Sequence, residues 1–263
     1  YLQQKLNDDF VSPLTELELR SSGIQNLLEK LKPLAVLSQM NLGSHGALGY
    51  YASKIGISSF LISHGSHILH KTIHEKREHE IIAKNILYGN YSHLAVQSPF
   101  AKKMVLARQN KDDNIVKIKP TLWGGKVHHR IKNDEKFTIV HAGTPKFRHQ
   151  RRLIYETSDE YVRALADICD CVRSSERIHL IIKTRPLDYE LTVESLATLL
   201  SPLPNNVVIE TSRTFHDVLA ETDLLISFSS TTLEEALVND VPVLLYGGHG
   251  RYAHIPVEPF SEN

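Results

Sequence analysis

Short apolar runs alternate with amphipathic segments along most of this chain. The apolar runs are rich in valine, isoleucine and leucine, which is typical of strands buried in a parallel sheet. The segments between them repeat apolar residues at helical spacing. Strands that alternate with helices predict an α/β fold with parallel sheets. The expected strands lie at 34–37, 58–62, 93–96, 115–118, 137–140, 178–182, 207–209, 224–226 and 241–246.

Helices are expected between these strands, and one long helical segment precedes them. The main ones lie at 46–54, 71–87, 99–108, 159–172, 189–200, 215–221 and 232–238. Residues 1–32 also have a helical pattern, with an apolar stripe that breaks around 21–23 and a stop at Pro33. A tight turn is expected at 141–145, directly after a strand.

The alternation stops between the two halves of the chain and then starts again. Residues 120–136 carry Pro120, paired glycines and scattered charge without a period, which is typical of an interdomain linker. The fold class predicted is therefore α/β, with two doubly wound Rossmann-like parallel-sheet domains, 1–119 and 137–263, and a cleft between them.

Composition narrows the range of partners. The 263 residues are 41% hydrophobic, enough for two domain cores, and the formal net charge of zero gives no indication of nucleic-acid binding. No apolar run approaches the roughly 20 residues that span a bilayer. The two cysteines, Cys169 and Cys171, are expected on different faces of a helix, which favours a reducing compartment. The 15 histidines show no metal-ligand spacing.

The segment 224–246 indicates a candidate anion site. A buried strand leads into Ser229, Ser230 and Thr231, and a helix is expected to begin near Thr232. Backbone N–H groups at a helix start, with hydroxyls beside them, suit a phosphate group. Glu235, with Glu234 as the competing choice, is placed to accept hydrogen bonds from a ribose diol. The alternative is that the hydroxyls only cap the helix and the carboxylates only complement its dipole.

Other polar residues follow strands, where open α/β sheets bind their ligands. They are His64, Gly143, Thr144, Lys183 and Arg185. Lysine and arginine there would neutralise phosphate, and a histidine next to a glycine is a candidate general base. Each of these residues also has an interpretation without a ligand. His64 would shape its turn, Gly143 would serve turn geometry, and Lys183 and Arg185 would be solvated surface charges. The basic loop 146–152 is likewise either a phosphate or acceptor contact or simply solvated.

Several of these motifs resemble those of a known enzyme class. VHAGT, IIKTRP and ISFSSTTLEEALVNDVPVLLY resemble the donor-binding domain of GT-B glycosyltransferases. SSTTLEEA is similar to the phosphate-and-ribose motif of those enzymes and of UDP-N-acetylglucosamine 2-epimerase. FLISHGS looks like the His-Gly element of bacterial capsule and teichoic-acid transferases, including the CDP-glycerol glycerophosphotransferase type. The resemblance covers about residues 33–256. It departs at Arg185-Pro186, where that group often has His-Pro.

The resemblance implies a metal-independent transferase that moves a group from a nucleotide-activated donor to a surface-polysaccharide acceptor. His64 would be the base, residues 143, 144, 183, 185 and 229–231 would bind the donor phosphates, and Glu234 or Glu235 the ribose. The absence of an Asp-x-Asp motif agrees with that class, and no cofactor beyond the donor is implied. The implied partners are a nucleotide sugar and a carbohydrate or lipid-linked acceptor. The implied location is the cytoplasm, and peripheral association with the inner face of the membrane is compatible with the resemblance.

Two other functional classes stay open, as does the extent of the protein. A nucleotide-sugar epimerase or hydrolase on the same scaffold should carry extra carboxylates for base chemistry at the sugar. A catalytically silent GT-B-like binding protein is the third hypothesis. The first domain also shows fewer strands than a GT-B N-domain, and the chain begins at Tyr1. Both features predict a piece of a longer protein that, alone, is poorly soluble or dimerises through a sheet edge.

Overall fold

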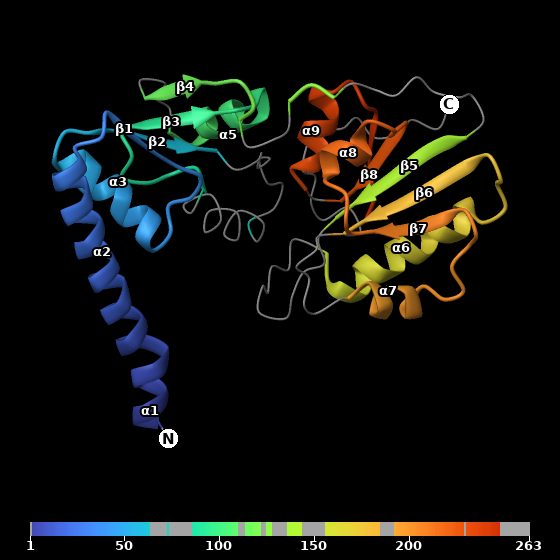
Figure 1. The fold of residues 1–263 in the computed structure, drawn as a ribbon, viewed down its shortest axis with the longest axis horizontal. Helices are drawn as coiled ribbons and strands as arrows, with labels where there is room; N and C mark the ends of the chain where they lie inside the picture. The colour runs from blue at the N-terminus through green and yellow to red at the C-terminus, as the bar shows by residue number, and fades with distance from the viewer. Residues whose placement is uncertain are drawn as a thin grey trace. The chain divides into compact units, whose positions relative to one another are not determined.

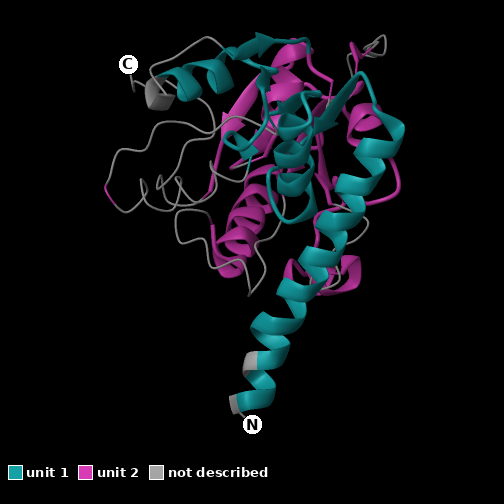
Figure 2. Cartoon of the chain, turned by 90° about the vertical axis from the view of Figure 1, so that its left-hand side faces the viewer, with its two compact units in different colours: residues 1–69, 76–119 teal, residues 70–75, 120–263 magenta. Residues whose placement is uncertain are grey.

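The chain divides into two compact units. The computed structural model describes residues 2–63, 73, 86–109, 114–121, 125–127, 136–143, 156–184, 192–228 and 230–247. Unit 1 comprises Tyr1–Leu69 with Lys76–Lys119, and unit 2 comprises His70–Glu75 with Pro120–Asn263 (Figure 2). Each unit has its own parallel sheet, so the predicted fold class of two parallel-sheet α/β domains is confirmed.

Unit 1 contains a four-stranded sheet in the order in which its strands follow along the chain (Figure 1). All of its neighbouring strands pair in parallel. The strands are β1 (Ala35–Ser38), β2 (Ser58–Ile62), β3 (His93–Val96) and β4 (Ile115–Lys117). Their positions agree with the apolar runs, to within one residue at the ends.

The helices of unit 1 include the long helical segment expected at 1–32. They are α1 (Leu2–Leu6), α2 (Ser12–Leu31), α3 (Ser44–Lys54) and α5 (Pro99–Gln109), with a π-helical turn, η1, at Asn7–Val11. α2 runs without interruption through residues 21–23, where the apolar stripe breaks. Serine and glycine cost at most about 1 kcal/mol each inside a helix, which the surrounding turns can offset. The helix stops at Lys32, whose φ of 44° precedes Pro33.

Apolar packing in unit 1 is uneven. Leu28 of α2, Val36 of β1 and Ala52 of α3 form one buried cluster. A second cluster joins β2 and β3 to α5 through Leu61, Leu94, Val96, Met104 and Val105. By contrast, much of the apolar stripe of α2 and two leucines at β1 are exposed. These residues are Leu14, Leu19, Leu27, Leu31, Leu34 and Leu37.

Unit 2 contains a five-stranded parallel sheet of order β7-β6-β5-β8-β9 (Figure 1). The strands are β5 (Phe137–Ala142), β6 (Ile178–Lys183), β7 (Val207–Glu210), β8 (Leu224–Ser227) and β9 (Val243–Leu245). The helices are α6 (Ser158–Val172), α7 (Val193–Leu199), α8 (Phe215–Leu219) and α9 (Thr232–Val238).

Alternate strand residues of unit 2 pack against opposite helix layers. Leu180 and Ile182 contact the cluster formed by α6 and α7. Ile181, between them, belongs to the cluster formed by α8 and α9. Successive strand side chains point to opposite faces, so a sheet covered on both sides needs a continuous apolar run. The all-apolar strand sequences follow from this doubly wound arrangement.

Four strands of unit 2, β5 to β8, extend further than the apolar runs. β5 continues through Ala142 and β6 through Lys183, and these two residues pair in the sheet. The tight turn expected to start at His141 is therefore wrong at its first residues, because His141 and Ala142 are still in the ladder. The extension brings Lys183 onto the sheet itself.

Part of the segment expected to be a linker packs on unit 2. Val127 is buried in the cluster with α8 and α9, and its N–H donates to Asn239 Oδ1 at 2.8 Å. Lys126 forms an exposed ion pair with Asp240 at 3.1 Å. Among the helices that the structure describes, none is both long and apolar enough to cross a membrane.

Candidate functional site

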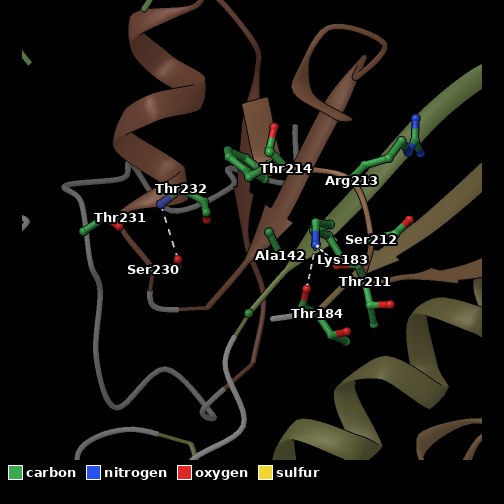
Figure 3. Close-up of a pocket in the computed structure, with 12 residues that line it drawn as sticks. Ala142, Lys183, Thr184, Thr211, Ser212, Arg213, Thr214, Ser230, Thr231 and Thr232 are labelled. Carbon is green, nitrogen blue, oxygen red and sulfur yellow. Dashed lines mark hydrogen bonds between the residues drawn. The ribbon is translucent and has the colours of Figure 1, made fainter. Parts of the chain in front are cut away.

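A pocket of about 280 Å³ opens at the carboxyl ends of strands in unit 2 (Figure 3). Its walls come from the ends of β5 and β6, from the loop between β7 and α8, and from the start of α9. Most of the lining side chains carry hydroxyl groups. The lining residues are Ala142, Gly143, Lys183, Thr184, Thr211, Ser212, Arg213, Thr214, Phe215, Ser230, Thr231 and Thr232.

Lys183 is the cation buried at this pocket. Only 8% of its surface is exposed, which excludes the alternative that it is a solvated surface charge. Its Nζ donates to Thr184 O at 2.7 Å and approaches the carbonyls of Glu210 and Thr211 at 3.5 Å (Figure 3). Burial lowers the pKa of Lys183, while the nearby Glu210 carboxylate raises it. An ammonium has three donors, and two of these three carbonyl contacts are long and weak at 3.5 Å, so an anion can compete with them for the ammonium.

The start of α9 forms the opposite wall. The helix begins at Thr232, as predicted, and the Ser230 hydroxyl accepts a hydrogen bond from Thr232 N at 3.3 Å (Figure 3). Thr231 occupies the N-cap position with helical φ and ψ and makes no side-chain cap bond. Ser230 therefore makes the side-chain contact to the helix start, and both residues line the pocket.

The two candidate ribose ligands differ sharply in environment. Glu234 is 2% exposed and is one of the three buried residues of α9, with Leu233 and Ala236. The Glu235 carboxylate is 12% exposed and lies 3.9 Å from His216 Nδ1. Neither is among the pocket-lining residues. Glu235 is the more accessible of the pair, and its role as a ribose ligand stays a prediction.

The sequence analysis missed the loop 211–214, which lines a large part of the pocket. Glu210 organises it: its Oε1 accepts from Ser212 N and Ser212 Oγ, both at 2.7 Å, and from Arg213 N at 3.1 Å. Its Oε2 accepts from Arg213 Nε at 2.7 Å, and Arg213 Nη1 also donates to Glu221 at 2.5 Å. These bonds, led by the Ser212 hydroxyl, lower the pKa of Glu210 to about 2.

Arg213 is thus held by two carboxylates. Figure 3 shows its guanidinium directed away from the Lys183 amine. Its charge is compensated by Glu210 and Glu221, whereas Lys183 faces the pocket from the sheet. The only sequence signal for this network was the run of polar residues after β7, which resembles any surface turn.

The sequence analysis also did not predict that His141 is buried. It is 3% exposed, its ring meets that of Tyr161 edge-to-face at 5.7 Å, and its Nδ1 has no hydrogen-bond partner in the described part of the chain. Burial lowers its pKa to about 4. A Cβ on Gly143 would lie 3.0 Å from the His141 ring and 3.1 Å from that of Tyr161. Gly143 therefore has a packing role as well as a place at the pocket.

Several predicted site residues lie outside the described residues. They are His64, Thr144, Arg185 and Ser229, together with the basic loop 146–152. In unit 1 the described residues before His64 end at Ser63, whose backbone carbonyl accepts a hydrogen bond from Gln97 Nε2 at 2.7 Å. Among the residues described, no group of His, Cys, Asp and Glu could hold a metal ion. Cys169 is buried and Cys171 exposed, as expected of different helix faces.

Comparison with known proteins shows the fold. No protein-family model and no curated protein matches the chain. It is similar to the solved structure of a putative UDP-N-acetylglucosamine 2-epimerase from Listeria monocytogenes, with 17% identity and a TM-score of 0.57 over 87% of this chain and 61% of that one. It is similar to the solved structure of UDP-GlcNAc 2-epimerase from Neisseria meningitidis bound to UDP-GlcNAc, with 16% identity and a TM-score of 0.58 over 87% of this chain and 63% of that one. It is also similar to the solved structure of S. aureus MnaA in complex with UDP, with 12% identity and a TM-score of 0.56 over 87% of this chain and 61% of that one.

These similarities support the GT-B fold that the sequence motifs implied, with two α/β domains that each contain a parallel sheet. The chain spans about three fifths of the length of these neighbours.

Proposed function

We propose that this chain binds a nucleotide-activated sugar in the pocket of unit 2 and transfers the sugar to an acceptor. The observation that carries the proposal is the buried Lys183 ammonium at a pocket lined with hydroxyl groups. A diphosphate between Lys183 and the Ser230–Thr232 backbone would meet one cation and several hydroxyl donors. Thr144, Arg185 and Ser229 remain part of this proposal on sequence grounds.

The proposed reaction develops negative charge on the group that leaves, and the pocket of unit 2 is suited to stabilise that charge. When a nucleotide-sugar bond breaks, negative charge grows on the departing diphosphate. A fixed cation in a partly dry pocket stabilises that charge more in the transition state than in the bound donor, which lowers the barrier. The acceptor hydroxyl needs a base, and His64 stays the candidate because it follows β2 directly after Ser63.

The diphosphate role of Lys183 is tested by calorimetry with UDP, CDP, GDP and CMP. We expect Lys183→Met to weaken binding of the preferred diphosphate at least tenfold, about 1.4 kcal/mol, because a charged hydrogen bond is lost. Lys126→Met, which removes an exposed lysine of the same unit, is the matched control. Unchanged affinity in a folded Lys183→Met protein would refute the phosphate site.

The ribose role of Glu235 is tested in the same way. Glu235→Ala should weaken nucleoside diphosphate binding about tenfold, since the carboxylate would no longer accept from the ribose hydroxyls. Glu194→Ala is the control, because Glu194 is exposed on α7 of the same unit. Equal affinities in both variants would remove Glu235 from the site.

Epimerisation is a second candidate function, favoured by one observation. The neighbours from Listeria monocytogenes and Neisseria meningitidis are described as UDP-N-acetylglucosamine 2-epimerases, and the second binds UDP-GlcNAc. The described strand ends of unit 1 offer Ser38, Ser63 and Gln97 rather than carboxylates, which favours transfer over base chemistry at the sugar carbon.

Incubation with UDP-GlcNAc in D₂O distinguishes the activities. A 2-epimerase must break and remake the C2–H bond, so deuterium would enter the sugar at C2. A transferase should leave C2 unlabelled and release UDP when an acceptor is supplied, with His64→Ala lowering turnover by roughly 10² to 10⁴. Tight UDP binding with neither product would instead indicate a catalytically silent binding protein.

A further inference from the structure

Unit 1 contains a serine–histidine pair at the carboxyl end of its first strand. Ser38 is the last residue of β1, and His45 is the second residue of α3, the helix that follows this strand (Figure 1). Ser38 Oγ lies 3.0 Å from His45 Nδ1. Ser38 is buried, whereas His45 is exposed. The pair therefore joins a buried hydroxyl group to an imidazole ring that a ligand can reach.

The hydrogen bonds of Ser38 fix the tautomer of His45. Ser38 Oγ lies 2.9 Å from the Met40 carbonyl, which can only accept, so the single hydroxyl proton is directed at Met40 O. The lone pairs of Oγ then face Met40 N at 3.4 Å and His45 Nδ1 at 3.0 Å. Donation to His45 Nδ1 instead would leave two oxygen atoms 2.9 Å apart with no proton between them. His45 Nδ1 therefore carries the proton, and the free lone pair of the neutral ring is on Nε2.

The backbone of His45 is also held in place. The Tyr91 hydroxyl donates to His45 O, and His45 N donates to Leu42 O at 3.0 Å. Tyr91 is buried, and its ring lies against Gly49 of α3, where an added Cβ would be 2.6 Å from Cε2 of that ring. A base that is oriented in this way, by a second group at its other ring nitrogen, is the arrangement that proton transfer requires.

His45 Nε2 is left for a ligand. Among the described residues, the only hydrogen bond of the His45 ring is the one from Nδ1 to Ser38. Ligands of open α/β sheets bind outside the carboxyl ends of the strands. β1 pairs in parallel with β2, and His64, the candidate base from the sequence, follows β2 along the chain. His45 thus follows a strand that neighbours β2, at the sheet edge where the acceptor is expected.

A second serine–histidine pair lies at the amino end of the same sheet. Ser92 Oγ donates to Ser59 O at 2.9 Å and lies 2.9 Å from His93 Nδ1, so the same reasoning puts the His93 proton on Nδ1. His93 is the first residue of β3, and its ring stacks on that of Phe60 at 4.7 Å. The two pairs share their hydrogen bonding and differ in the end of the sheet at which they lie, which makes His93 a matched control.

We propose that His45 is a further catalytic residue of the transfer proposed above, and that its Nε2 accepts the proton of the acceptor hydroxyl. The inference rests on that proposed function. As the acceptor oxygen forms its bond to the sugar carbon, its proton moves to Nε2. The bond from that carbon to the diphosphate oxygen breaks, and its electron pair leaves on the diphosphate. Because Nδ1 already donates to Ser38, Nε2 is the nitrogen that can take the proton, and Ser38 is a positioning residue.

The tautomer is tested by NMR on the full chain with ¹⁵N-labelled histidine, at a pH at which the ring is neutral. We expect the His45 proton on Nδ1, with the signal assigned by its loss in His45→Ala. Ser38→Ala should move the proton towards Nε2, since the acceptor for Nδ1 is lost, whereas Ser38→Thr keeps a hydroxyl and should not. A proton on Nε2 of His45 in the wild type would overturn the inference whatever the activity.

The base role is tested by the release of UDP from UDP-GlcNAc, with water and with glycerol as acceptors. His45→Ala should lower turnover by roughly 10² to 10⁴ with little change in KM, as expected for a lost base. Added imidazole should restore part of this turnover, which it would not do for a structural role. His93→Ala should keep most of the wild-type turnover and should not respond to imidazole. Wild-type turnover in His45→Ala, or a loss that imidazole does not restore, would contradict the base role.

Two further comparisons separate the alternatives. If imidazole restores His64→Ala but not His45→Ala, His64 is the base and the inference is wrong. Ser38→Ala should lower kcat less than His45→Ala does, and Ser38→Thr should keep it. UDP affinity by calorimetry should be the same in His45→Ala and wild type, because the donor pocket belongs to unit 2. A wild type that releases no UDP would overturn the proposed transfer together with the base role, whereas an active enzyme that does not need His45 would overturn the base role alone.

Discussion

At the scale of single residues, burial decides what a side chain can do. Lys183 is one of many lysines in the sequence, and its position after a strand left a surface role open. In the structure it is pulled into the sheet, its ammonium is desolvated, and its pKa falls. A lysine in this state is a stronger partner for a phosphate than an exposed one, because little water competes with the ligand.

The lowered pKa of Lys183 gives a pH prediction. The lysine binds a diphosphate only while it is protonated, so affinity should be lost as pH rises through its pKa, which lies below the ordinary 10.5. We expect UDP affinity measured by calorimetry to decline with rising pH already below the ordinary lysine pKa of 10.5, because burial lowers the pKa of Lys183. Lys183→Arg should keep its affinity flat over the same pH values, because arginine stays charged. A wild-type profile as flat as that of the arginine variant would contradict the role.

His141 should make the protein sensitive to acid. Its pKa is about 4 in the folded protein against the ordinary histidine value of 6.5, so the unfolded chain binds the proton more readily. Stability is therefore complete above pH 6.5 and is lost progressively as pH falls towards 4, by up to about 3 kcal/mol. His141→Phe, which keeps a ring against Tyr161, should remove this part of the acid loss.

Urea unfolding at pH 7.5 and pH 4.5 measures the effect of His141. The relevant quantity is the change in unfolding free energy between the two pH values, compared between wild type and variant. His179→Phe is the control, since His179 lies on neighbouring β6 and is partly exposed. If His141→Phe and wild type lose the same free energy, the buried ring does not titrate as proposed.

At the scale of elements, the site depends on the connection between β7 and α8. Glu210, at the end of β7, holds the loop 211–214 through two backbone N–H groups and the Ser212 hydroxyl. The helix that follows is capped by a reciprocal pair, Thr214 and Asp217. The loop is thus fixed from both ends, which orders its hydroxyl groups along the pocket before a ligand arrives.

Glu210→Gln tests this ordering. We expect a loss of about 1–2 kcal/mol in unfolding free energy at pH 7, because charge-assisted bonds are removed, together with weaker UDP binding. The pKa of Glu210 is lowered from 4.5 to about 2, so its stabilisation is present above pH 4.5 and lost as pH falls through 2. The difference from wild type should shrink over that window.

Glu221→Gln provides the matched control for Glu210. It removes the other carboxylate that Arg213 contacts and leaves the loop backbone bonds in place. UDP affinity should therefore change less than in Glu210→Gln. Equal weakening in both variants would show that Arg213 itself, rather than loop order, is what the nucleotide needs.

At the scale of the whole molecule, the proposed donor pocket belongs to one unit. All residues that line it lie in unit 2, which has two apolar clusters of its own. We expect residues 120–263, expressed alone, to fold and to bind UDP with an affinity within about tenfold of the full chain. Starting at residue 137 should cost stability, because Val127 packs in the core and bonds to Asn239. Loss of all UDP binding in 120–263 would show that unit 1 is needed for the donor.

The sequence by itself determined the parallel α/β architecture, the strands of both sheets and the start of α9. Strands covered on both faces need continuous apolar runs, and helices need an apolar stripe. Both patterns involve residues close together in the sequence, so they can be recognised from the sequence alone. Lys183, Ser230 and Thr231 could be predicted as candidates because ligand sites of open sheets follow strand ends, and all three line the pocket of unit 2.

Only the tertiary structure decided which of these groups are buried and what they contact. The Glu210–Arg213–Glu221 network joins residues whose spacing resembles an ordinary surface turn, and its bonds exist only because β7 and α8 bring them together. His141 falls within an apolar strand, but its isolation from hydrogen-bond partners depends on Tyr161 of α6.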